Sequence, residues 1–227
     1  MYTLYVGNKN YSSWSLRGWL AARLSGAPFR EVPVRLVGRG PNPANKGFSP
    51  SGLVPALHDG DIVVWDTLAI AEYLAERHAG MWPAEPKARA HARSVSAEMH
   101  SGFPALRNDM SMCIRERVDV RPWSPALVAD VDRVAEIWSE GRRRFGRGGS
   151  FLCGTFCVAD AFYAPVAFRF RTYDVQPSGA AADYLAAMLG HPWLREWEGA
   201  ALAEPTVIEL DEPRVVYRDK LAAAGRA

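Results

Sequence analysis

A run of hydroxyl side chains near the N-terminus could bind an anion. Ser12, Ser13 and Ser15 lie where a β-prone run gives way to a segment with helical periodicity. A helix N-terminus presents unpaired N–H groups and the positive end of the helix dipole. Because a thiolate is an anion, such a turn lowers a thiol pKa, and a serine hydroxyl that donates to the sulfur lowers it further. Serines at this place are also ordinary N-caps, so the run alone fits either interpretation.

Two further motifs could bind the ends of a peptide. A cis Val54–Pro55 bond at the start of a predicted strand would turn the main chain of Val54 outward as a free edge, with which an extended peptide could pair. The alternative is an ordinary proline at a strand edge, which implies no ligand. Asp66 and Thr67 lie at a strand-to-helix junction. There Thr67 and nearby amides could bind a carboxylate and Asp66 an amino group, or either residue could simply cap the helix. The three motifs together describe a ligand with a thiol, a peptide backbone and an α-amino acid end, all of which glutathione has.

The elements that must position these motifs alternate between strand and helix in the first eighty residues. Apolar residues recur with helical spacing in two segments, and Asp59-Gly60 is typical of a hairpin turn. The expected elements are a strand at 2–6, a helix at 14–24, a strand at 29–34, a loop at 38–52, strands at 54–58 and 62–65, and a helix at 66–78. This β-α-β-loop-β-β-α order predicts an α/β domain over residues 1–79, followed by a linker at 80–86.

Only helices are expected in residues 87–227. Apolar side chains recur every three or four residues from Ala88 to Cys113, which predicts one long helix kinked at Pro104. Further helices are expected at 124–145, 158–173, 180–189 and 192–203. The fold class is therefore a small α/β domain followed by an all-α domain, which by itself names no function.

Composition excludes several classes of partner. Lys and Arg total 27 against 25 Asp and Glu, so the net charge of +2 gives no basic field for nucleic acid. The one basic cluster, Arg142-Arg143-Arg144 with Arg147, ends a predicted helix, where cations suit the dipole. The histidines lack metal-ligand spacing, the three cysteines form no CxxC pair, and no long apolar run suggests a signal or a membrane span. We expect a cytoplasmic protein without a metal, nucleic-acid or membrane partner.

The ordered motifs resemble those of the cytosolic glutathione transferase superfamily. The Ser-Ser-x-Ser-x-Arg pattern from Ser12 to Arg17 is most similar to the zeta class and its bacterial relatives, and the resemblance covers nearly all 227 residues. It implies a thioredoxin-like domain that holds glutathione as co-substrate and a helical domain that builds the pocket for a hydrophobic electrophile. It also implies a homodimer, formed through the helix that closes the first domain and the long helix from Lys87.

The resemblance assigns roles to individual residues. Ser12 takes the place of the serine that activates the thiol, and Ser13 and Ser15 could share that role. The positions implied for glutathione binding are Val54, Pro55, Asp66 and Thr67. The glycine carboxylate also needs a cation, for which the preceding loop offers Arg39 and Lys46; Lys46 is preferred, although both could be solvated loop charges. The expected lining of the electrophile pocket is Tyr11, Trp14, Met99, Phe103, Arg107, and Tyr163 or Phe168.

The expected activity is transfer of glutathione to an electrophile. Cis–trans isomerisation of maleylacetoacetate is an alternative, for which the family uses an arginine that binds the acid substrate; the matching position here is Thr172, with Arg171 about 100° away on the helix. A non-catalytic ligand carrier and a serine-type peroxidase also stay open, whereas a disulfide reductase would need a cysteine before Cys113. The segment from Gly154 to Ala161 resembles the family's capping box, in which Asp160 is structural.

Overall fold

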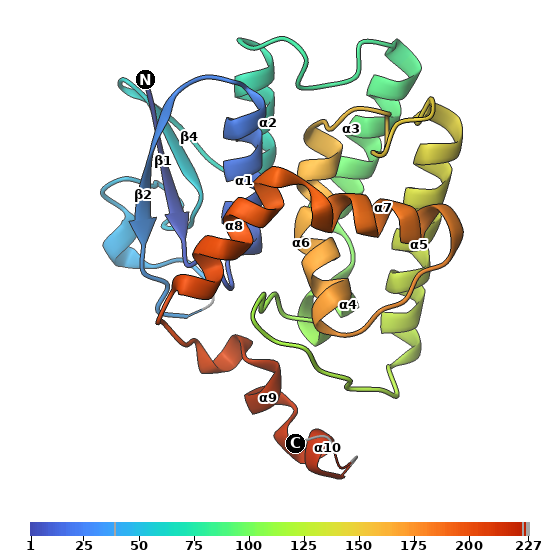
Figure 1. The fold of residues 1–227 in the computed structure, drawn as a ribbon. Coiled ribbons are helices and arrows are strands. Elements are labelled where there is room, and N and C mark those ends of the chain that lie inside the picture. Colours follow the sequence, from blue (N-terminus) through green and yellow to red (C-terminus); the bar gives the residue numbers. More distant parts are fainter. Residues whose placement is uncertain (39, 224, 226–227) are drawn as a thin grey trace.

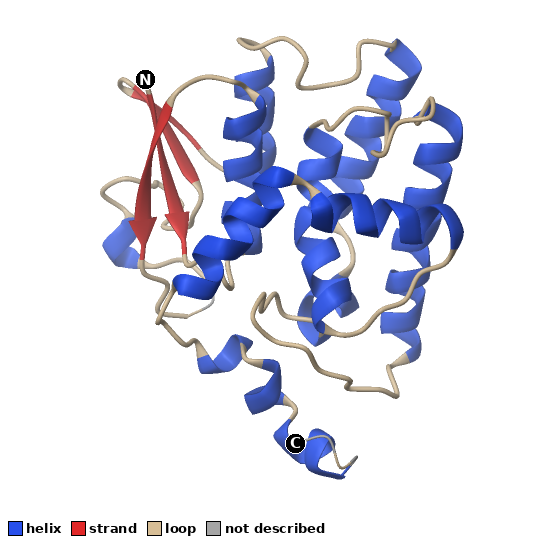
Figure 2. Ribbon diagram, in the orientation of Figure 1, coloured by secondary structure: helices blue, strands red, loops and turns tan. Residues whose placement is uncertain are grey.

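The N-terminal part of the chain is a mixed four-stranded sheet covered on one face by two helices (Figures 1 and 2). The computed structural model describes residues 1–38, 40–223 and 225. The sheet order is β2-β1-β3-β4, with β1 parallel to β2 and antiparallel to β3. The elements are β1 (Tyr2–Gly7), α1 (Ser13–Leu24), β2 (Phe29–Val34), the short helix η1 (Pro43–Asn45), β3 (Ala56–Asp59), β4 (Ile62–Val64) and α2 (Thr67–Ala75). The expected thioredoxin-like arrangement of strands and helices is confirmed.

Helix α1 lies between the sheet and the helical domain, and this position fixes the turn that carries the serines. It contacts β1 and α2 on one side and α6 on the other. Leu16 and Leu20 are fully buried, as are Leu4 of β1 and Ile70 of α2. A helix that buries apolar residues against both domains holds its first turn in place at their boundary.

The regular elements of the C-terminal part are all helices among the described residues, and α6 runs through its centre (Figure 1). Every residue of α6 except Arg171 is buried, and the helix contacts α1, α3 and α7. The elements are α3 (Pro86–Ser101), α4 (Pro104–Asp109), α5 (Pro125–Phe145), α6 (Val158–Thr172), α7 (Gly179–Gly190), α8 (Pro192–Ala203), η2 (Glu209–Asp211), α9 (Pro213–Val216) and α10 (Arg218–Ala223).

The prediction of one long helix from Lys87 to Cys113 is wrong. Helix α3 ends at Ser101, Phe103 takes a left-handed conformation with φ 61°, and Pro104 begins the separate helix α4. A proline disfavours helical backbone in the residue before it and cannot donate to a preceding turn, so the chain breaks here rather than kinks. Met110 and Cys113 keep the buried positions that the apolar pattern assigned them, but outside a helix.

The segment from Glu204 to Ala223 returns to the domain boundary, which the sequence did not predict. After α8 the segment through η2, α9 and α10 runs along the lower edge of the molecule in Figure 1. It is bonded to the chain on both sides: the Glu204 carboxylate accepts from the amides of Lys9 and Asn10, and the Ser111 hydroxyl donates to the Asp211 carbonyl. This segment therefore borders the loop that leads into α1.

The expected cap of α6 is present and depends on Asp160. Its carboxylate is fully buried and accepts from the amides of Leu152 at 3.1 Å and Cys157 at 2.8 Å and from the Tyr184 hydroxyl at 2.9 Å. Burial raises the pKa of Asp160 to about 6, against the effect of its hydrogen bonds. Asp160 is thus a structural residue at the centre of the helical domain, as its place in the capping box indicated.

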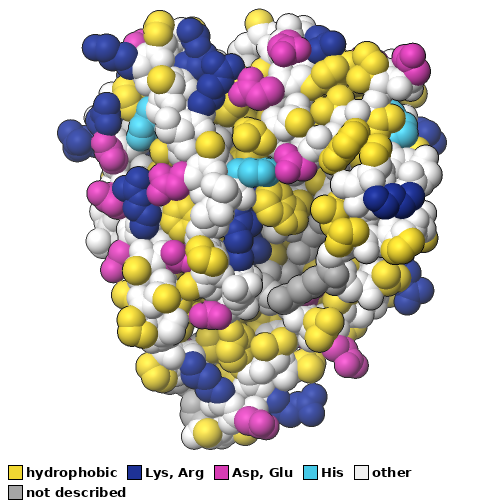
Figure 3. Space-filling view, turned by 180° about the vertical axis from the view of Figure 1, so that it is seen from behind, with side chains coloured by type: hydrophobic (Ala, Val, Ile, Leu, Met, Phe, Trp, Pro, Cys, Tyr) yellow, Lys and Arg dark blue, Asp and Glu magenta, His cyan; other side chains and the backbone are white. Residues whose placement is uncertain are grey.

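Basic and acidic side chains are mixed over the face of the molecule shown in Figure 3. No helix in the described ranges combines the length and apolar character needed to cross a bilayer. The same residues contain no group of three or more His, Cys, Asp or Glu side chains close enough to hold a metal ion.

Candidate functional site

A cavity of about 650 Å³ lies where the two domains meet, and three predicted motifs open into it. Ser12 and Ser13 at the start of α1, Val54 and Pro55 before β3, and the start of α2 all contribute to its lining. The opposite wall comes from α4, the chain after it, and α6. Motifs separated by more than fifty residues in the sequence therefore share one site.

The three serines have different environments. The Ser12 hydroxyl caps α1 by accepting from the Ser15 amide at 3.3 Å, and it donates to the Ser15 hydroxyl oxygen at 2.8 Å. Ser15 is fully buried behind the cavity wall, where its oxygen also accepts from the Gly7 amide at 2.8 Å. The Ser13 hydroxyl lines the cavity and has no hydrogen-bond partner in the described part of the chain. Ser12 and Ser13 can reach a ligand, whereas Ser15 supports Ser12 from inside.

The bond between Val54 and Pro55 is cis, as the strand motif predicted. Strand β3 starts at Ala56 rather than Val54, so Val54 lies outside the paired part of the sheet with its main chain beside the cavity. Gly18 of α1 packs directly against the proline ring: a Cβ at that glycine would lie 2.7 Å from Pro55 Cγ. The absence of a side chain at Gly18 thus allows α1 and the Val54 segment to approach closely.

Asp66 and Thr67 begin α2 on the cavity wall, with different degrees of exposure. The Asp66 carboxylate caps the helix by accepting from the Leu68 amide at 3.1 Å, and its other oxygen lies 3.2 Å from His100 Nε2 of α3. Burial lowers the pKa of His100, so the ring is neutral near pH 7 and donates to Asp66. Thr67 is fully buried, and its hydroxyl oxygen has no partner among the described residues although the residue lines the cavity. An unpartnered buried hydroxyl fits a ligand atom at this point.

The basic side chains that line the cavity differ from those predicted to bind the glycine carboxylate. Lys46 does not line the cavity, and its ammonium donates to the Pro50 carbonyl at 2.5 Å. Arg39 lies outside the described residues. Arg35, Arg107 and Arg169 line the cavity instead.

Two of these arginines are held by main-chain carbonyls. The Arg107 guanidinium donates to the carbonyls of Gly102 at 2.8 Å and His100 at 3.2 Å, at the end of α3. Arg169 Nε donates to the Met110 carbonyl at 2.7 Å. Both guanidinium groups are therefore fixed in place at the wall opposite the serines.

An arginine lines the cavity one helical turn before Thr172, the position matched to the isomerase arginine. The Thr172 hydroxyl donates to the Cys113 carbonyl at 2.8 Å, and the Arg171 guanidinium pairs with the Glu198 carboxylate at 2.6 Å. Neither residue lines the cavity. Arg169 lies three residues before Thr172 and so shares its helix face.

The side chains predicted to line the electrophile pocket are right in part. Tyr11, Trp14 and Arg107 line the cavity. The other four predicted side chains are buried in the core instead; these are Met99, Phe103, Tyr163 and Phe168. Their apolar pattern did not distinguish a core position from a cavity wall.

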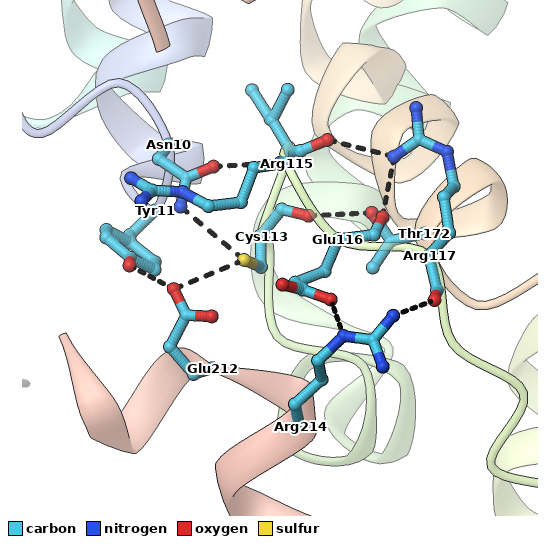
Figure 4. Close-up of polar contacts among 10 residues, drawn as sticks. Asn10, Tyr11, Cys113, Arg115, Glu116, Arg117, Thr172, Glu212 and Arg214 are labelled. Carbon is cyan, nitrogen blue, oxygen red and sulfur yellow. Dashed lines mark hydrogen bonds and ion pairs between the residues drawn. The ribbon is translucent and has the colours of Figure 1, made fainter. Parts of the chain in front are cut away.

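The Tyr11 hydroxyl is bonded to the C-terminal segment and not to a serine hydroxyl (Figure 4). Its hydroxyl donates to the buried carboxylate of Glu212, which also accepts from the Cys113 thiol at 3.6 Å. Burial, with this hydrogen bond, raises the pKa of Tyr11 to about 12. Asn10 donates to the Cys113 sulfur at 3.4 Å. Tyr11 is thus a protonated wall residue whose hydroxyl is already engaged.

The comparisons with known proteins agree with this geometry. Residues 11–77, which hold all three motifs, match the family model described as "Glutathione S-transferase, N-terminal domain". Residues 11–77 therefore form a domain of the glutathione S-transferase N-terminal family. The rat protein "Maleylacetoacetate isomerase" is 26% identical over 162 residues, which are 69% of this chain and 74% of that protein. Matches to a "Probable maleylacetoacetate isomerase" from Caenorhabditis elegans and a "Maleylacetoacetate isomerase" from Mus musculus span 49% and 50% of those proteins.

Solved structures share the two-domain fold of this chain. A glutathione transferase homologue from Burkholderia, solved with bound glutathione, superposes with a TM-score of 0.67 at 21% identity and covers 89% of this chain and 99% of its own. A maleyl pyruvate isomerase described as a bacterial zeta-class glutathione S-transferase gives a TM-score of 0.66 at 21% identity, over 91% of this chain and 100% of its own. The sequence relatives therefore confirm the predicted likeness to the zeta class and its bacterial relatives, and the solved structures show the shared fold.

Proposed function

We propose that this protein binds glutathione and uses its thiolate to isomerise an unsaturated, carboxylate-bearing substrate of the maleylacetoacetate type. Three isomerases of this description are among its sequence relatives. The observation that carries the proposal is that Arg107 and Arg169 line the same cavity as Ser12 and Ser13. Hydroxyls and a helix N-terminus at one wall suit a thiolate, and two guanidinium groups at the other suit a carboxylate.

The residues of the thioredoxin-like domain suit the three parts of glutathione. Ser12 and Ser13 would face the sulfur, the open main chain of Val54 would pair with the peptide backbone, and Asp66 with Thr67 would hold the γ-glutamyl end. The unpartnered Thr67 hydroxyl supports this fit, because a buried hydroxyl without a partner is costly unless a ligand supplies one. For the glycine carboxylate Arg35 replaces Lys46 as the candidate cation, since Arg35 lines the cavity.

The chemistry requires no metal and no net transfer of protons. Attack by the thiolate on one carbon of a conjugated double bond forms a carbon–sulfur bond and leaves a single bond between the two carbons, about which the substrate rotates. Loss of the thiolate then restores the double bond in the trans form. Arg107 and Arg169 would stabilise the negative charge that develops on the substrate during addition.

The test is isomerisation of maleylacetoacetate, followed by the loss of its ultraviolet absorption with and without glutathione. We expect turnover only with glutathione. Arg169→Met should raise KM for the acid at least tenfold while KM for glutathione stays within twofold, because a charge-assisted hydrogen bond is worth about 1.5–3 kcal/mol. No glutathione-dependent turnover, or an equal change in both KM values, would contradict the assignment. Binding without turnover of any electrophile would indicate a ligand carrier.

A conjugating transferase is a second candidate, favoured by the apolar part of the same cavity. Trp14, Leu53 and Trp65 line it and offer a surface for a neutral aromatic electrophile. A chloronitrobenzene assay separates the two activities, since Arg169→Met should leave conjugation of a neutral substrate within twofold of wild type. We also propose a homodimer through α2 and α3, which sedimentation analysis would test by giving a mass of twice 25.0 kDa.

A further inference from the structure

Arg17 of α1 is a buried cation that makes no hydrogen bond. Its side chain is 1% exposed, and none of its three guanidinium nitrogens has a partner in the described part of the chain. Arginine keeps its proton in proteins, so the charge is present. A buried charge without hydrogen bonds is costly to fold around, and a leucine would fill the space without that cost. The charge therefore calls for an explanation beyond packing.

Aromatic rings surround the guanidinium. Its central carbon lies 4.6 Å from the centroid of a Trp14 ring and 5.3 Å from that of Phe162. Arg107 lies 4.9 Å from the centroid of a Trp14 ring, and His100 packs edge-on against this indole at 5.2 Å. Cation–π contacts offset part of the cost of burial. Trp14 is thus held between cations where it lines the cavity.

The charged groups around Arg17 place it directly behind the cavity wall. Burial, reinforced by the like charges of Arg107 and Arg169, lowers the pKa of Arg17, and Asp66 acts in the opposite direction. These three neighbours all line the cavity. The titratable or charged side chains that face this region from the packed elements are Arg107 of α4, Arg169 and Tyr163 of α6, His100 of α3 and Asp66 at the start of α2.

Arg17 also shares a helix face with the serine turn. It follows Ser13 by four residues, so the two side chains are neighbours on α1. Side chains of a helix tilt toward its N-terminus, which brings a long side chain at position 17 back over the turn that begins the helix. Its positive charge therefore adds to the helix dipole at the place where the sulfur of glutathione would lie.

We propose that Arg17 is a positioning residue that stabilises the thiolate of bound glutathione, through its buried positive charge and through its hold on Trp14. The inference rests on the proposed function, because it requires glutathione with its sulfur at the start of α1. A unit charge within about 8–10 Å, in a medium of effective dielectric constant near 20, shifts a pKa by about one unit. Arg17 should account for a shift of that size, separate from the contribution of the serines.

The experiment is a titration of bound glutathione by the ultraviolet absorbance of the thiolate, in wild type and in Arg17→Met. Methionine keeps most of the side-chain length and removes the charge. We expect the thiol pKa to rise by about one unit in Arg17→Met, and the pH profile of kcat/KM to move up by the same amount. Arg17→Gln replaces the charged group with a neutral polar one. If Arg17→Met does not fold, the bound-thiol pKa is measured in Arg17→Gln instead.

Arg23→Met is the matched control on the same helix. Arg23 pairs with Glu196 at 2.9 Å, away from the cavity, so its loss should leave the bound-thiol pKa unchanged. A folded neutral variant of Arg17 with the wild-type thiol pKa would overturn the inference and leave the proposed function standing. A wild-type protein that binds no glutathione would overturn both.

Discussion

Replacing Asp160 with alanine tests the structural centre of the helical domain. Its carboxylate accepts three hydrogen bonds, from the amides of Leu152 and Cys157 and from the hydroxyl of Tyr184. At about 2 kcal/mol for each bond to a charged acceptor, their loss costs about 6 kcal/mol. Burial disfavours the ionised carboxylate even with these bonds made, as its raised pKa of about 6 shows, so its removal offsets part of that loss. We therefore expect Asp160→Ala to lower the free energy of unfolding by about 3 kcal/mol at pH 7.

The same shift gives the prediction a pH dependence with a definite sign. Because the folded pKa lies above the unfolded value, the folded protein binds the proton more tightly, and wild type gains stability as the pH falls from about 6 toward 4. Asp160→Ala has no such group. The difference between the two proteins should therefore be about 1 kcal/mol larger at pH 5 than at pH 7.

Urea unfolding followed by circular dichroism measures both quantities. Asp132→Ala is the matched control, because Asp132 is exposed on α5, and we expect a change within about 0.5 kcal/mol. Asp160→Asn should fall between wild type and alanine, since an amide keeps one acceptor oxygen. A loss below about 1 kcal/mol in Asp160→Ala, or a loss that shrinks at pH 5, would refute the assignment of Asp160 as the buried acceptor that holds α6.

Three further changes test the cavity wall. Gly18→Ala places a methyl 2.7 Å from the Pro55 ring, so we expect a loss of about 1–3 kcal/mol and weaker glutathione binding in calorimetry; an unchanged Tm would contradict the close contact. Arg35→Ala should raise the Kd of glutathione severalfold while Lys46→Ala changes it less than twofold, and the reverse order would restore Lys46 as the carboxylate-binding cation. Glu212→Ala leaves a buried hydroxyl without its acceptor, so limited proteolysis should cut the C-terminal segment faster, and a wild-type cleavage rate would contradict the role given to that bond.

The N-terminal domain was predictable because each of its elements has a local signal. Strand β2 matches its predicted bounds, and α1 begins one residue from the expected place, since periodicity and turn residues act over short distances. Helix α8 also matches its predicted bounds. The break at Gly102 and Phe103 was missed, although the proline that follows was recognised, because an uninterrupted apolar pattern outweighed it.

The cavity wall depends on contacts between distant segments, and here sequence reasoning was weaker. The three motifs were found because each combines a special residue with a helix or strand boundary. Arg35 follows β2 and Arg169 lies in α6, so their shared place at the cavity depends on how these distant segments pack together. The C-terminal helices are four and six residues long, too short for periodicity to reveal, yet one of their neighbours, Asp211, also lines the cavity.

The charge state of glutathione bound at the start of α1 is the most direct measure of the whole account. Ultraviolet titration of the complex should give a thiol pKa about two units below that of free glutathione in wild type. The double variant Ser12→Ala and Ser13→Ala should return at least half of that shift, because both hydroxyls at the cavity are removed while the helix dipole remains. A thiol pKa equal to that of the free tripeptide in wild type would contradict the claim that this helix start holds the thiolate.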